Sequence, residues 1–480
     1  MSDITIERID EHRWIVPPTG GMRVPGMIYS SETMLGGIGA DESLRQVANV
    51  AHLPGIIQYS FAMPDMHWGY GFPIGGVAAF DVKEGIISPG GVGYDINCGV
   101  RAMTTGLTYP DIRGKMNNLV SALFNDIPSG VGSTGKLKLS LREERKVLCD
   151  GAGWAVKNGY GSPEDIITTE NKGKMEGADP ACVSDRALER GRAQLGTLGS
   201  GNHFLEIEVV EEIYDEVAAQ AFGLEYAQVV FVIHSGSRGL GYQVCDDYLA
   251  RMVKQVQTLG FPLPDRQLAC AYLSSHEGKE YYAAMACAAN YAWANRQMLM
   301  HWTRETIERT LGMSPRDLRM NLLYDVCHNI AKFEEFPIEG EKRKVCVHRK
   351  GATRAYPPGH DELPAKYRSV GQPVLIPGDM GTGSYILAGT EKAFTETFGS
   401  TCHGAGRVMS RSRAVKESRK RAIASEMAER GVVVMAKGKR TLNEEMPEAY
   451  KKVDDVVDVV HRAGLSKKVA RLRAIGCIKG

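Results

Sequence analysis

A chain of 480 residues can bury one very large hydrophobic core or two to three ordinary ones. Its apolar fraction of 43% and charged fraction of 24% are ordinary for a globular enzyme. Because the formal net charge is only +1, no global field attracts nucleic acid, and any basic surface must be local.

The lack of a membrane span and of a secretory signal predicts a cytoplasmic location, and the cysteines predict neither a zinc ribbon nor a disulfide framework. No apolar run is long enough to cross a bilayer, and the opening residues 1–14 contain acids without the apolar stretch of a secretory signal. The ten cysteines show neither CxxC pairs nor even spacing, which argues against a zinc ribbon or a disulfide framework. Most of them are expected to be small buried hydrophobic residues.

The N-terminal part of the chain predicts strands and tight turns. Glycine alternates with short apolar runs in "GFPIGGVAAFDV" at 71–82 and in "GIISPGGVGYDINCGVRAM" at 85–103. Further on, "QVVFVIHSGSRG" at 228–239 predicts a buried β-branched strand that ends in a histidine and a glycine-rich turn.

Helical patterns occupy 242–259 and 281–311, and further helices are expected over 408–430 and in two stretches after Pro447. Strands and helices do not alternate as strict βαβ units, so the predicted class is α+β, with central sheets and peripheral helices. We expect a single domain over 1–480, with a helical insertion or subdomain around 242–315.

Glycine, serine and histidine recur together at three places: "LGSGNHFLE" at 198–206, "IHSGSRG" at 233–239 and "FGSTCHGAG" at 398–406. A further histidine lies in "YDVCHNIAKFEE" at 324–335, and a candidate thiolate in "GGVGYDINCGVR" at 90–101. Glycine-rich turns let backbone N–H groups converge on an anion, and His, Cys and Asp bind transition metals. The recurrence therefore indicates one site that handles a metal and phosphates together.

Each candidate taken alone has a simpler interpretation. Asp95 could belong to a turn, Cys98 could be a buried thiol, and Asp65 could cap the turn before His67. An isolated loop or core role would equally explain His203, His234 and His328.

Read in order, the motifs resemble the RtcB-type RNA ligases. The resemblance runs from "MRVPG" at residue 22 to Gly480 and rests on long strings: "SPGGVGYDINCGVR", "GSGNHFLE", "HSGSRG", "HRKGATRAYPPGH", "GTGSYILAG", "FGSTCHGAGR" and the closing "IKG". It implies a large α+β fold and an enzyme that joins RNA with a 2′,3′-cyclic phosphate or 3′-phosphate to RNA with a 5′-hydroxyl. The expected cofactors are GTP and two Mn²⁺ ions, and the expected substrates are tRNA halves or damaged RNA. The need for an archease-type activator stays open.

The resemblance also implies residue roles. His403 would be the nucleophile that takes GMP from GTP. The implied metal ligands are Asp95, Cys98, His203, His234 and His328, with Cys98 bridging both ions; the residue types alone would equally permit zinc. The implied GTP contacts are Asn202, His203, Phe204, Leu205, Glu206, His328, Asn329, Pro377, Gly378, Asp379, Met380, Ser384, His403, Gly404, Ala405, Gly406 and Lys479.

Two details of the nucleotide site go further. Glu206 is expected to accept hydrogens from guanine N1–H and its amino group. Family members usually read Pro-Gly-Ser-Met where this chain has "PGDM", so Asp379 replaces a serine. Its carboxylate would either recruit an extra cation, the alternative we favour, or only set the turn.

Two local stretches are expected to bind RNA phosphates. Residues 407–421 contain seven Lys or Arg and one acid, and residues 461–480 contain six Lys or Arg and no acid. The RNA contacts predicted in the first stretch are Arg407, Arg411 and Arg413. Binding of this kind weakens steeply with salt and reads no base sequence.

Two other functional classes use the same residues. A dinuclear metal phosphodiesterase would activate water and need neither GTP nor a covalent histidine. A non-catalytic RNA-binding protein could keep a metal for stability alone. Retention of label from α-labelled GTP distinguishes the ligase from both.

Overall fold

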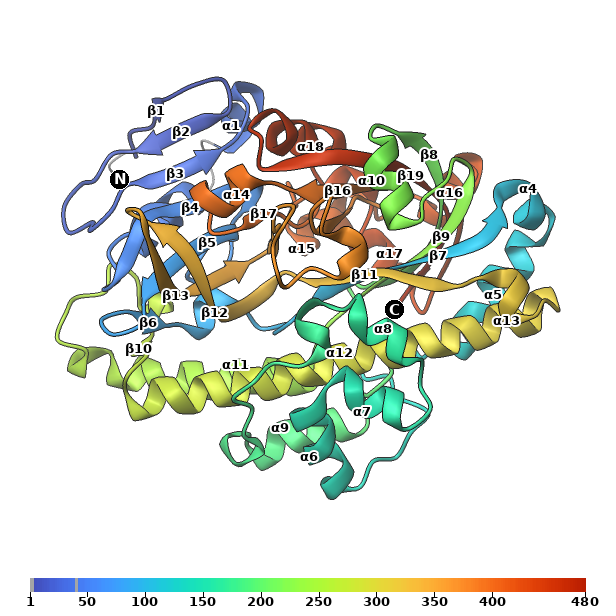
Figure 1. The fold of residues 1–480 in the computed structure, drawn as a ribbon, viewed down its shortest axis with the longest axis horizontal. Coiled ribbons are helices and arrows are strands. Elements are labelled where there is room, and N and C mark those ends of the chain that lie inside the picture. The colour runs from blue at the N-terminus through green and yellow to red at the C-terminus, as the bar shows by residue number, and fades with distance from the viewer. Residues whose placement is uncertain (1–3, 39–41) are drawn as a thin grey trace.

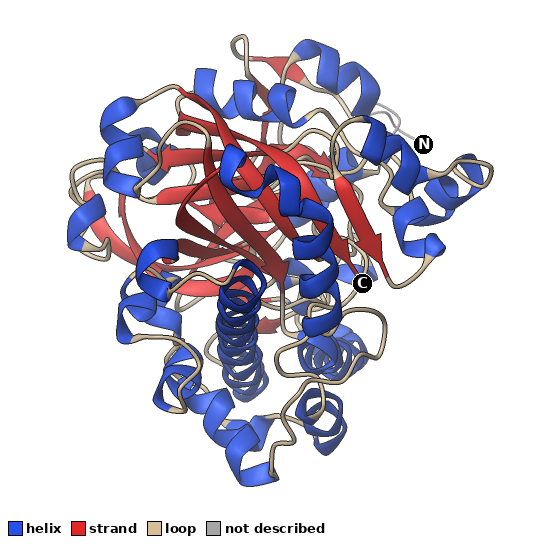
Figure 2. Ribbon diagram, turned by 90° about the vertical axis from the view of Figure 1, so that its right-hand side faces the viewer, coloured by secondary structure: helices blue, strands red, loops and turns tan. Residues whose placement is uncertain are grey.

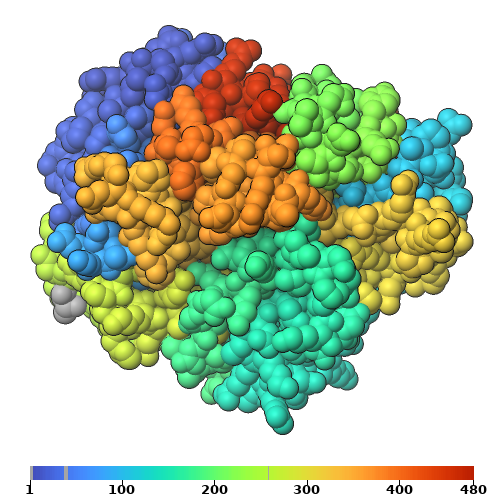
Figure 3. Space-filling view, in the orientation of Figure 1, coloured from blue at the N-terminus to red at the C-terminus, as the bar shows by residue number. Residues whose placement is uncertain are grey.

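The structure, a computed structural model, describes residues 4–38 and 42–480. Strands and helices are mixed as the sequence predicts, and the α+β class is confirmed. Two large sheets lie beside one another, and long helices run beneath them (Figures 1 and 2). The segment that carries helices α6 to α9 bulges from the lower side of the molecule (Figure 3). Among the described residues, no helix is both long and apolar enough to cross a membrane.

The first sheet has seven strands in the order β1-β2-β3-β4-β5-β13-β12. Their bounds are Glu7–Arg8 for β1, Arg13–Val16 for β2, Gly26–Tyr29 for β3, Ile56–His67 for β4, Ile74–Asp81 for β5, Glu341–Lys350 for β13 and Asn329–Ile338 for β12. All neighbours pair antiparallel except β3 and β4.

The second sheet has eight strands in the order β11-β7-β9-β8-β19-β16-β15, and β18 pairs with β19. Their bounds are Asn321–Cys327 for β11, Gly99–Thr108 for β7, Gln228–Ser235 for β9, Phe204–Ile213 for β8, Ser466–Lys479 for β19, Ser384–Gly389 for β16, Pro373–Pro377 for β15 and Val433–Ala436 for β18. Two short pairs complete the strands: β6 Ile86–Ile87 with β10 Ala271–Tyr272, and β14 Ala352–Arg354 with β17 Ser400–Cys402.

The helices flank the sheets, and α11 and α12 run along their lower edge (Figure 1). The α-helices are α1 Glu32–Ile38, α2 Ser43–Val50, α3 Pro89–Val92, α4 Tyr109–Ile112, α5 Met116–Asp126, α6 Leu141–Asp150, α7 Ala152–Lys157, α8 Pro163–Ile167, α9 Asp185–Arg192, α10 Glu216–Phe222, α11 Arg238–Gln255, α12 His276–Leu311, α13 Pro315–Leu318, α14 Glu391–Glu396, α15 Arg411–Glu417, α16 Ile423–Glu429, α17 Lys439–Glu444 and α18 Val453–Arg462.

Local chemistry explains the elements that position the site. All eight residues of β9 are buried, because this β-branched strand lies between β7 and β8 with both faces covered. Helix α12 begins where the Ser275 hydroxyl caps Gly278 N–H at 3.1 Å and ends at Gly312, whose φ of 66° suits glycine. Its alanine-rich middle lets it pass close beneath the second sheet.

The predicted strands at 71–103 and 228–239 and the helices at 242–259 and 281–311 are present with shifted bounds. The helices expected over 408–430 are α15 and α16, and the first helix expected after Pro447 is α18. One expectation was wrong, because the second helix expected after Pro447 is the strand β19. In β19 the half-exposed Arg471 and Arg473 alternate with buried Ala470, Leu472 and Ala474, which is the period of a strand.

The cysteine expectation is confirmed. All ten cysteines are free thiols, and eight of them are buried.

Candidate metal and nucleotide site

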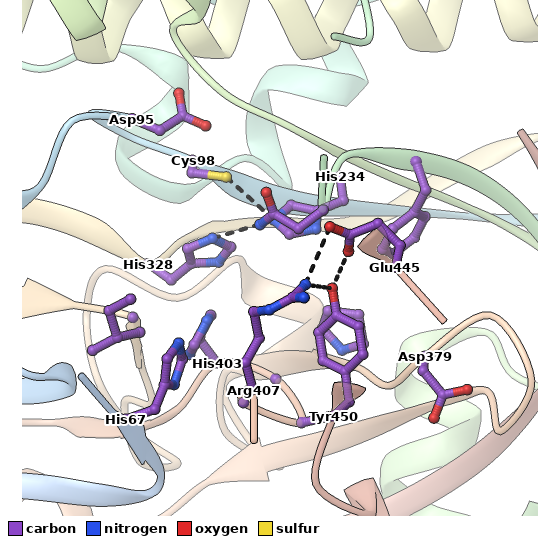
Figure 4. Close-up of a pocket in the computed structure, with 18 of the residues that line it drawn as sticks. His67, Asp95, Cys98, His234, His328, Asp379, His403, Arg407, Glu445 and Tyr450 are labelled. Carbon is purple, nitrogen blue, oxygen red and sulfur yellow. Dashed lines mark hydrogen bonds and ion pairs between the residues drawn. The ribbon is translucent and has the colours of Figure 1, made fainter. Parts of the chain in front are cut away.

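The five expected metal ligands converge at one end of the second sheet. They are Asp95, Cys98, His203, His234 and His328. Gly99, the first residue of β7, pairs with both Ser235 of β9 and Cys327 of β11, and Phe204 of β8 pairs with His234. Since neighbouring strands begin or end at this register, residues far apart in the sequence come together (Figure 4).

The ligand atoms form a chain of close approaches. Cys98 Sγ lies 3.2 Å from His234 Nε2 and 3.4 Å from His203 Nε2, and His234 Nε2 lies 3.3 Å from His328 Nε2. His203 Nε2 is also 2.8 Å from Asp95 Oδ2. Two groups of three therefore share Cys98, one with His234 and His328 and the other with Asp95 and His203. A thiolate common to both groups is suited to serve two metal ions at once.

The donor set fits a divalent transition metal. His203 Nδ1 lies 3.0 Å from the carbonyl oxygen of Leu198, so Nδ1 donates and Nε2 presents its lone pair to the cluster. Burial lowers the pKa of His234 and His328 well below the usual value and keeps both rings neutral, as ligands must be. Burial and the Asp95 charge raise the pKa of the Cys98 thiol, so a cation is needed to hold the thiolate.

Helix α12 fixes the ligand-bearing loops from behind. The Arg296 guanidinium donates to the carbonyl oxygens of Asn97 at 2.7 Å and Ser235 at 3.0 Å, and it pairs with Asp325 at 2.8 Å. The Asn295 amide donates to Ser235 Oγ and to the carbonyl oxygen of Thr197, both at 3.1 Å. These side chains are fully buried, so the loops are held by hydrogen bonds that water does not weaken.

His403 enters the site from a different part of the fold. It follows β17, and its ring lies 4.8 Å from the His328 ring, centroid to centroid. Its Nδ1 is 2.5 Å from Asp65 Oδ2, which also accepts the backbone N–H groups of His403 at 2.9 Å and Gly404 at 3.3 Å. Burial opposes ionisation of Asp65, but the charge and hydrogen bonds of His403 hold the pKa of this carboxyl below its usual value. When the His403 ring is neutral, ionised Asp65 makes Nδ1 the protonated nitrogen and leaves the Nε2 lone pair available.

Two glycines keep the surroundings of His403 open. Gly406 has a φ of 72°, and a Cβ there would lie 2.3 Å from the carbonyl oxygen of Asp65. A Cβ at Gly351 would lie 2.3 Å from the Ile74 side chain and 3.0 Å from Cε1 of His403. Side chains at these positions would therefore clash with the backbone or press on the imidazole ring.

Beside His403 a cavity of about 370 Å³ extends over the candidate metal ligands. Sixteen of the residues expected to bind metal or GTP line it, besides Lys479: Asp95, Cys98, Asn202, Phe204, Glu206, His234, His328, Asn329, Pro377, Gly378, Asp379, Met380, His403, Gly404, Ala405 and Gly406. Arg407, Arg411 and Lys479 also line it. His203, Leu205, Ser384 and Arg413 do not. Leu205 is fully buried in the core below β8, so its side chain cannot reach a nucleotide.

Ser384 supports Glu206 through a second carboxyl group. Its hydroxyl donates to Glu208 Oε1 at 2.6 Å, and Glu208 is the next residue on the same face of β8 as Glu206. Burial and the neighbouring Glu206 raise the pKa of Glu208 well above its usual value. Burial also raises the pKa of Glu206, so this pair of buried carboxyl groups opposes a second negative charge.

Lys479 lies at the end of β19 and is buried. It pairs with Phe204 in the strand register, and its Nζ lies 5.6 Å over the Phe204 ring and 3.9 Å from Glu445. Glu445 also accepts a hydrogen bond from the Arg407 guanidinium at 3.1 Å, and Tyr450 contacts both residues (Figure 4). The ammonium group is thereby held at the edge of the cavity.

Both carboxylate oxygens of Asp379 accept hydrogen bonds from residues of its own turn. Its Oδ1 accepts Gly381 N–H at 2.8 Å, and its Oδ2 accepts the Thr382 hydroxyl at 2.8 Å. Burial raises the pKa of this carboxyl. This geometry favours the alternative in which Asp379 sets the turn over the one in which it recruits a cation.

The two basic stretches differ. In 461–480 each cation that the strand exposes faces an acid: Lys467 with Asp215, Lys468 with Asp458, and Arg471 and Arg473 with Glu211. The expected phosphate-binding surface there is largely neutralised. In 407–421, Arg407 and Arg411 face Glu445 and Arg413 faces Glu417, but Arg411 and Arg413 keep 55% and 62% of their side-chain surface exposed, against 15% for Arg407.

Sequence reasoning missed several supporting residues. Asp65 was expected only to cap a turn, and Glu208, Gly351, Glu445 and Tyr450 were not singled out. A carboxylate two residues before His67 in "MPDMHWG" was a visible signal for Asp65. The other four depend on contacts between distant segments, for which a single sequence carries no signal.

The amino-acid sequence matches one protein family over most of its length. Residues 46–480 match the family model described as tRNA-splicing ligase RtcB. The chain is 55% identical over 477 residues to a tRNA-splicing ligase RtcB of Archaeoglobus fulgidus and 54% identical over 478 residues to that of Thermococcus kodakarensis, with 99% of each chain covered in both cases. It is 52% identical over 438 residues to an RNA-splicing ligase RtcB of Mycobacterium bovis, covering 91% of this chain and 100% of the relative.

Proposed function

This chain belongs to the RtcB family, and we propose that it is a GTP-dependent RNA ligase. It would join RNA ends that carry a 2′,3′-cyclic phosphate or 3′-phosphate to ends that carry a 5′-hydroxyl, in tRNA splicing or RNA repair. The observation that carries the proposal is the Asp65–His403 pair beside the Cys98 cluster in one cavity. In this arrangement Asp65 binds the Nδ1 of His403, and the Nε2 can act as a nucleophile next to candidate ligands for two cations.

In the first step His403 Nε2 attacks the α-phosphorus of GTP, and the bond to the pyrophosphate breaks. The proton on Nδ1 stays in place, because ionised Asp65 stabilises the positive charge that develops on the ring. The product is a phosphoramidate between His403 and GMP.

The later steps transfer GMP and release it. Water opens a cyclic phosphate to a 3′-phosphate, whose oxygen attacks the GMP phosphorus while His403 leaves. The 5′-hydroxyl then attacks the activated 3′-phosphate, and GMP departs. Two Mn²⁺ ions held by Asp95, Cys98, His203, His234 and His328 would supply charge stabilisation for phosphoryl oxygens.

We assign guanine recognition to Glu206 on the cavity lining. Glu206 lines the cavity, with Glu208 behind it on the same face of β8, and its carboxylate oxygens would accept the N1–H and amino hydrogens of guanine. Lys479 and Asn202 lie on the same lining and serve the ribose or phosphates.

The test is retention of label from α-labelled GTP after denaturing electrophoresis with Mn²⁺. The wild-type chain is expected to keep a label that is acid-labile and alkali-stable, and His403→Ala is expected to keep none. His67→Ala is the matched control, because His67 lines the same cavity and its Nδ1 lies 3.0 Å from the Asp65 carbonyl oxygen. Unlabelled wild-type protein that still cleaves RNA would support the phosphodiesterase instead.

A further inference from the structure

A second cavity of about 860 Å³ opens beside the catalytic one. The two share His67, Ile74, Arg407 and Arg411 on their linings. The new cavity continues outward along the end of β4, the segment before α15 and the segment before α18. A chain bound at His403 can therefore leave the catalytic cavity through this groove.

Trp68 forms one side of the groove and is unusually exposed. It follows β4 directly, and 62% of its surface is accessible, whereas Trp154, Trp293 and Trp302 are at most 7% accessible. The remaining tryptophan, Trp14, is partly buried and donates its indole N–H to the Ser30 carbonyl oxygen at 3.1 Å. A large aromatic face kept in water at the mouth of a site indicates a stacking partner.

The groove combines an apolar floor with basic walls. Met34, Met66, Ile74 and Met409 supply the apolar surface. The charged residues on its lining are five cations and one acid: Arg407, Arg411, Arg413, Lys451, Lys452 and Asp455. An apolar peptide would fit the floor alone, but the excess of cations favours an anionic strand whose bases are apolar on their faces.

We propose that Trp68 stacks on an unpaired base of the RNA strand next to the end being joined, while Arg411 and Arg413 contact its phosphates. This inference rests on the proposed function, since it takes the strand at His403 to be RNA. Stacking accepts any base, so the contact would hold a single-stranded end without selecting its sequence. A base in a duplex is covered by its neighbours and cannot stack on Trp68.

The first experiment compares Trp68→Ala and Trp68→Phe with the wild type in binding a fluorescently labelled ten-nucleotide single strand that ends in a 3′-phosphate. Binding to Trp68→Ala is expected to weaken by about ten- to 100-fold, and Trp68→Phe should recover most of it. Binding of a blunt RNA duplex should be unchanged. Equal affinities of Trp68→Ala and wild type for the single strand would overturn the proposal, as would an equal loss for the duplex.

A second measurement separates the proposal from the proposed function. Label retention from α-labelled GTP needs no RNA, so Trp68→Ala should be guanylylated like the wild type. If the wild type is guanylylated and Trp68→Ala binds RNA normally, the ligase stands and the stacking role fails. If no protein is guanylylated but the single strand still depends on Trp68, the stacking role stands and the ligase fails.

Salt dependence and fluorescence sharpen the assignment. Arg413→Gln should lower the slope of log affinity against log salt by about one, whereas Trp68→Ala should leave the slope unchanged. The single strand should also quench tryptophan emission in the wild type and not in Trp68→Phe. Quenching that survives in Trp68→Phe would place the stacked base elsewhere.

Discussion

The cluster of candidate metal ligands lies beside the His403 cradle, by which we mean Asp65 and the loop at 403–406. The two parts of the site are held in different ways. The cluster comes from adjoining strand ends of one sheet, and α12 holds its loops through buried hydrogen bonds from Arg296 and Asn295. His403 is held by one carboxylate from the other sheet and by the fixed backbone of its own loop. The ligand-bearing loops of the cluster are fixed from behind by α12, whereas the His403 ring is held through its Nδ1 by Asp65.

This difference matches what each part must do. Metal ligands have to keep their positions through a reaction, so a rigid, desolvated frame serves them. A nucleophile that becomes covalently attached and is then released needs one free face and an orienting partner. The comparison predicts that damage to the cluster spreads to the whole site, while damage to the cradle stays at His403.

The largest effect is expected from Cys98→Ala. Both groups of three candidate ligands share the Cys98 sulfur. Its loss should therefore remove more than one equivalent of Mn²⁺ per chain and abolish guanylylation. Elemental analysis after gel filtration measures the metal, and His234→Ala should retain more of it. Two ions retained by Cys98→Ala would show that the thiolate does not bridge.

Asp65→Asn should break the cradle and spare the cluster. The amide is nearly isosteric but cannot hold the Nδ1 proton as a carboxylate does, so guanylylation should slow by about 100- to 10,000-fold. Metal content should match the wild type. A change in metal content would mean that the two halves are not independent.

Glu170→Gln tests the frame behind the cluster. Glu170 accepts Cys327 N–H at 2.8 Å, one residue before His328, and pairs with buried Lys332. Burial opposes ionisation, but Lys332 and Arg354 lower the pKa of Glu170 from 4.5 to about 2. The unfolded chain therefore binds more protons between these values, and stability should fall by about 3 kcal/mol as pH drops from 4.5 to 2.

The measurement is the denaturation midpoint across that pH range in Glu170→Gln and wild type. The variant should be less stable at pH 7 and should lose less stability on acidification. Parallel curves for the two proteins would remove Glu170 from the frame.

The smallest effect is expected from Asp379→Ser. Since its carboxylate is occupied by Gly381 N–H and the Thr382 hydroxyl, the Mn²⁺ concentration for half-maximal guanylylation should change less than twofold. Guanylylation of Asp379→Ser at much lower Mn²⁺ would revive the alternative in which Asp379 recruits a cation near the triphosphate.

The sequence predicted the parts of this site that its motifs name. Asp95, Cys98, His203, His234, His328 and His403 are each flanked by glycine-rich or strand-end patterns, and the structure brings them together. The supports Arg296 and Asn295 were not predictable, because they contact loops that lie far from them in the sequence. The strand β19 was missed because its lysines and arginines resemble a helix surface until the period of two is checked.

The Asp65–His403 hydrogen bond joins residues 338 positions apart in the chain. Closing so long a loop gains nothing until the intervening strands have paired, so this contact must form late in folding. If His403 is guanylylated as proposed, a partly folded intermediate without this contact should acquire label from GTP far more slowly than the folded chain. Guanylylation would then count mainly molecules that have completed folding, and a labelling time course during refolding would follow a late assembly step.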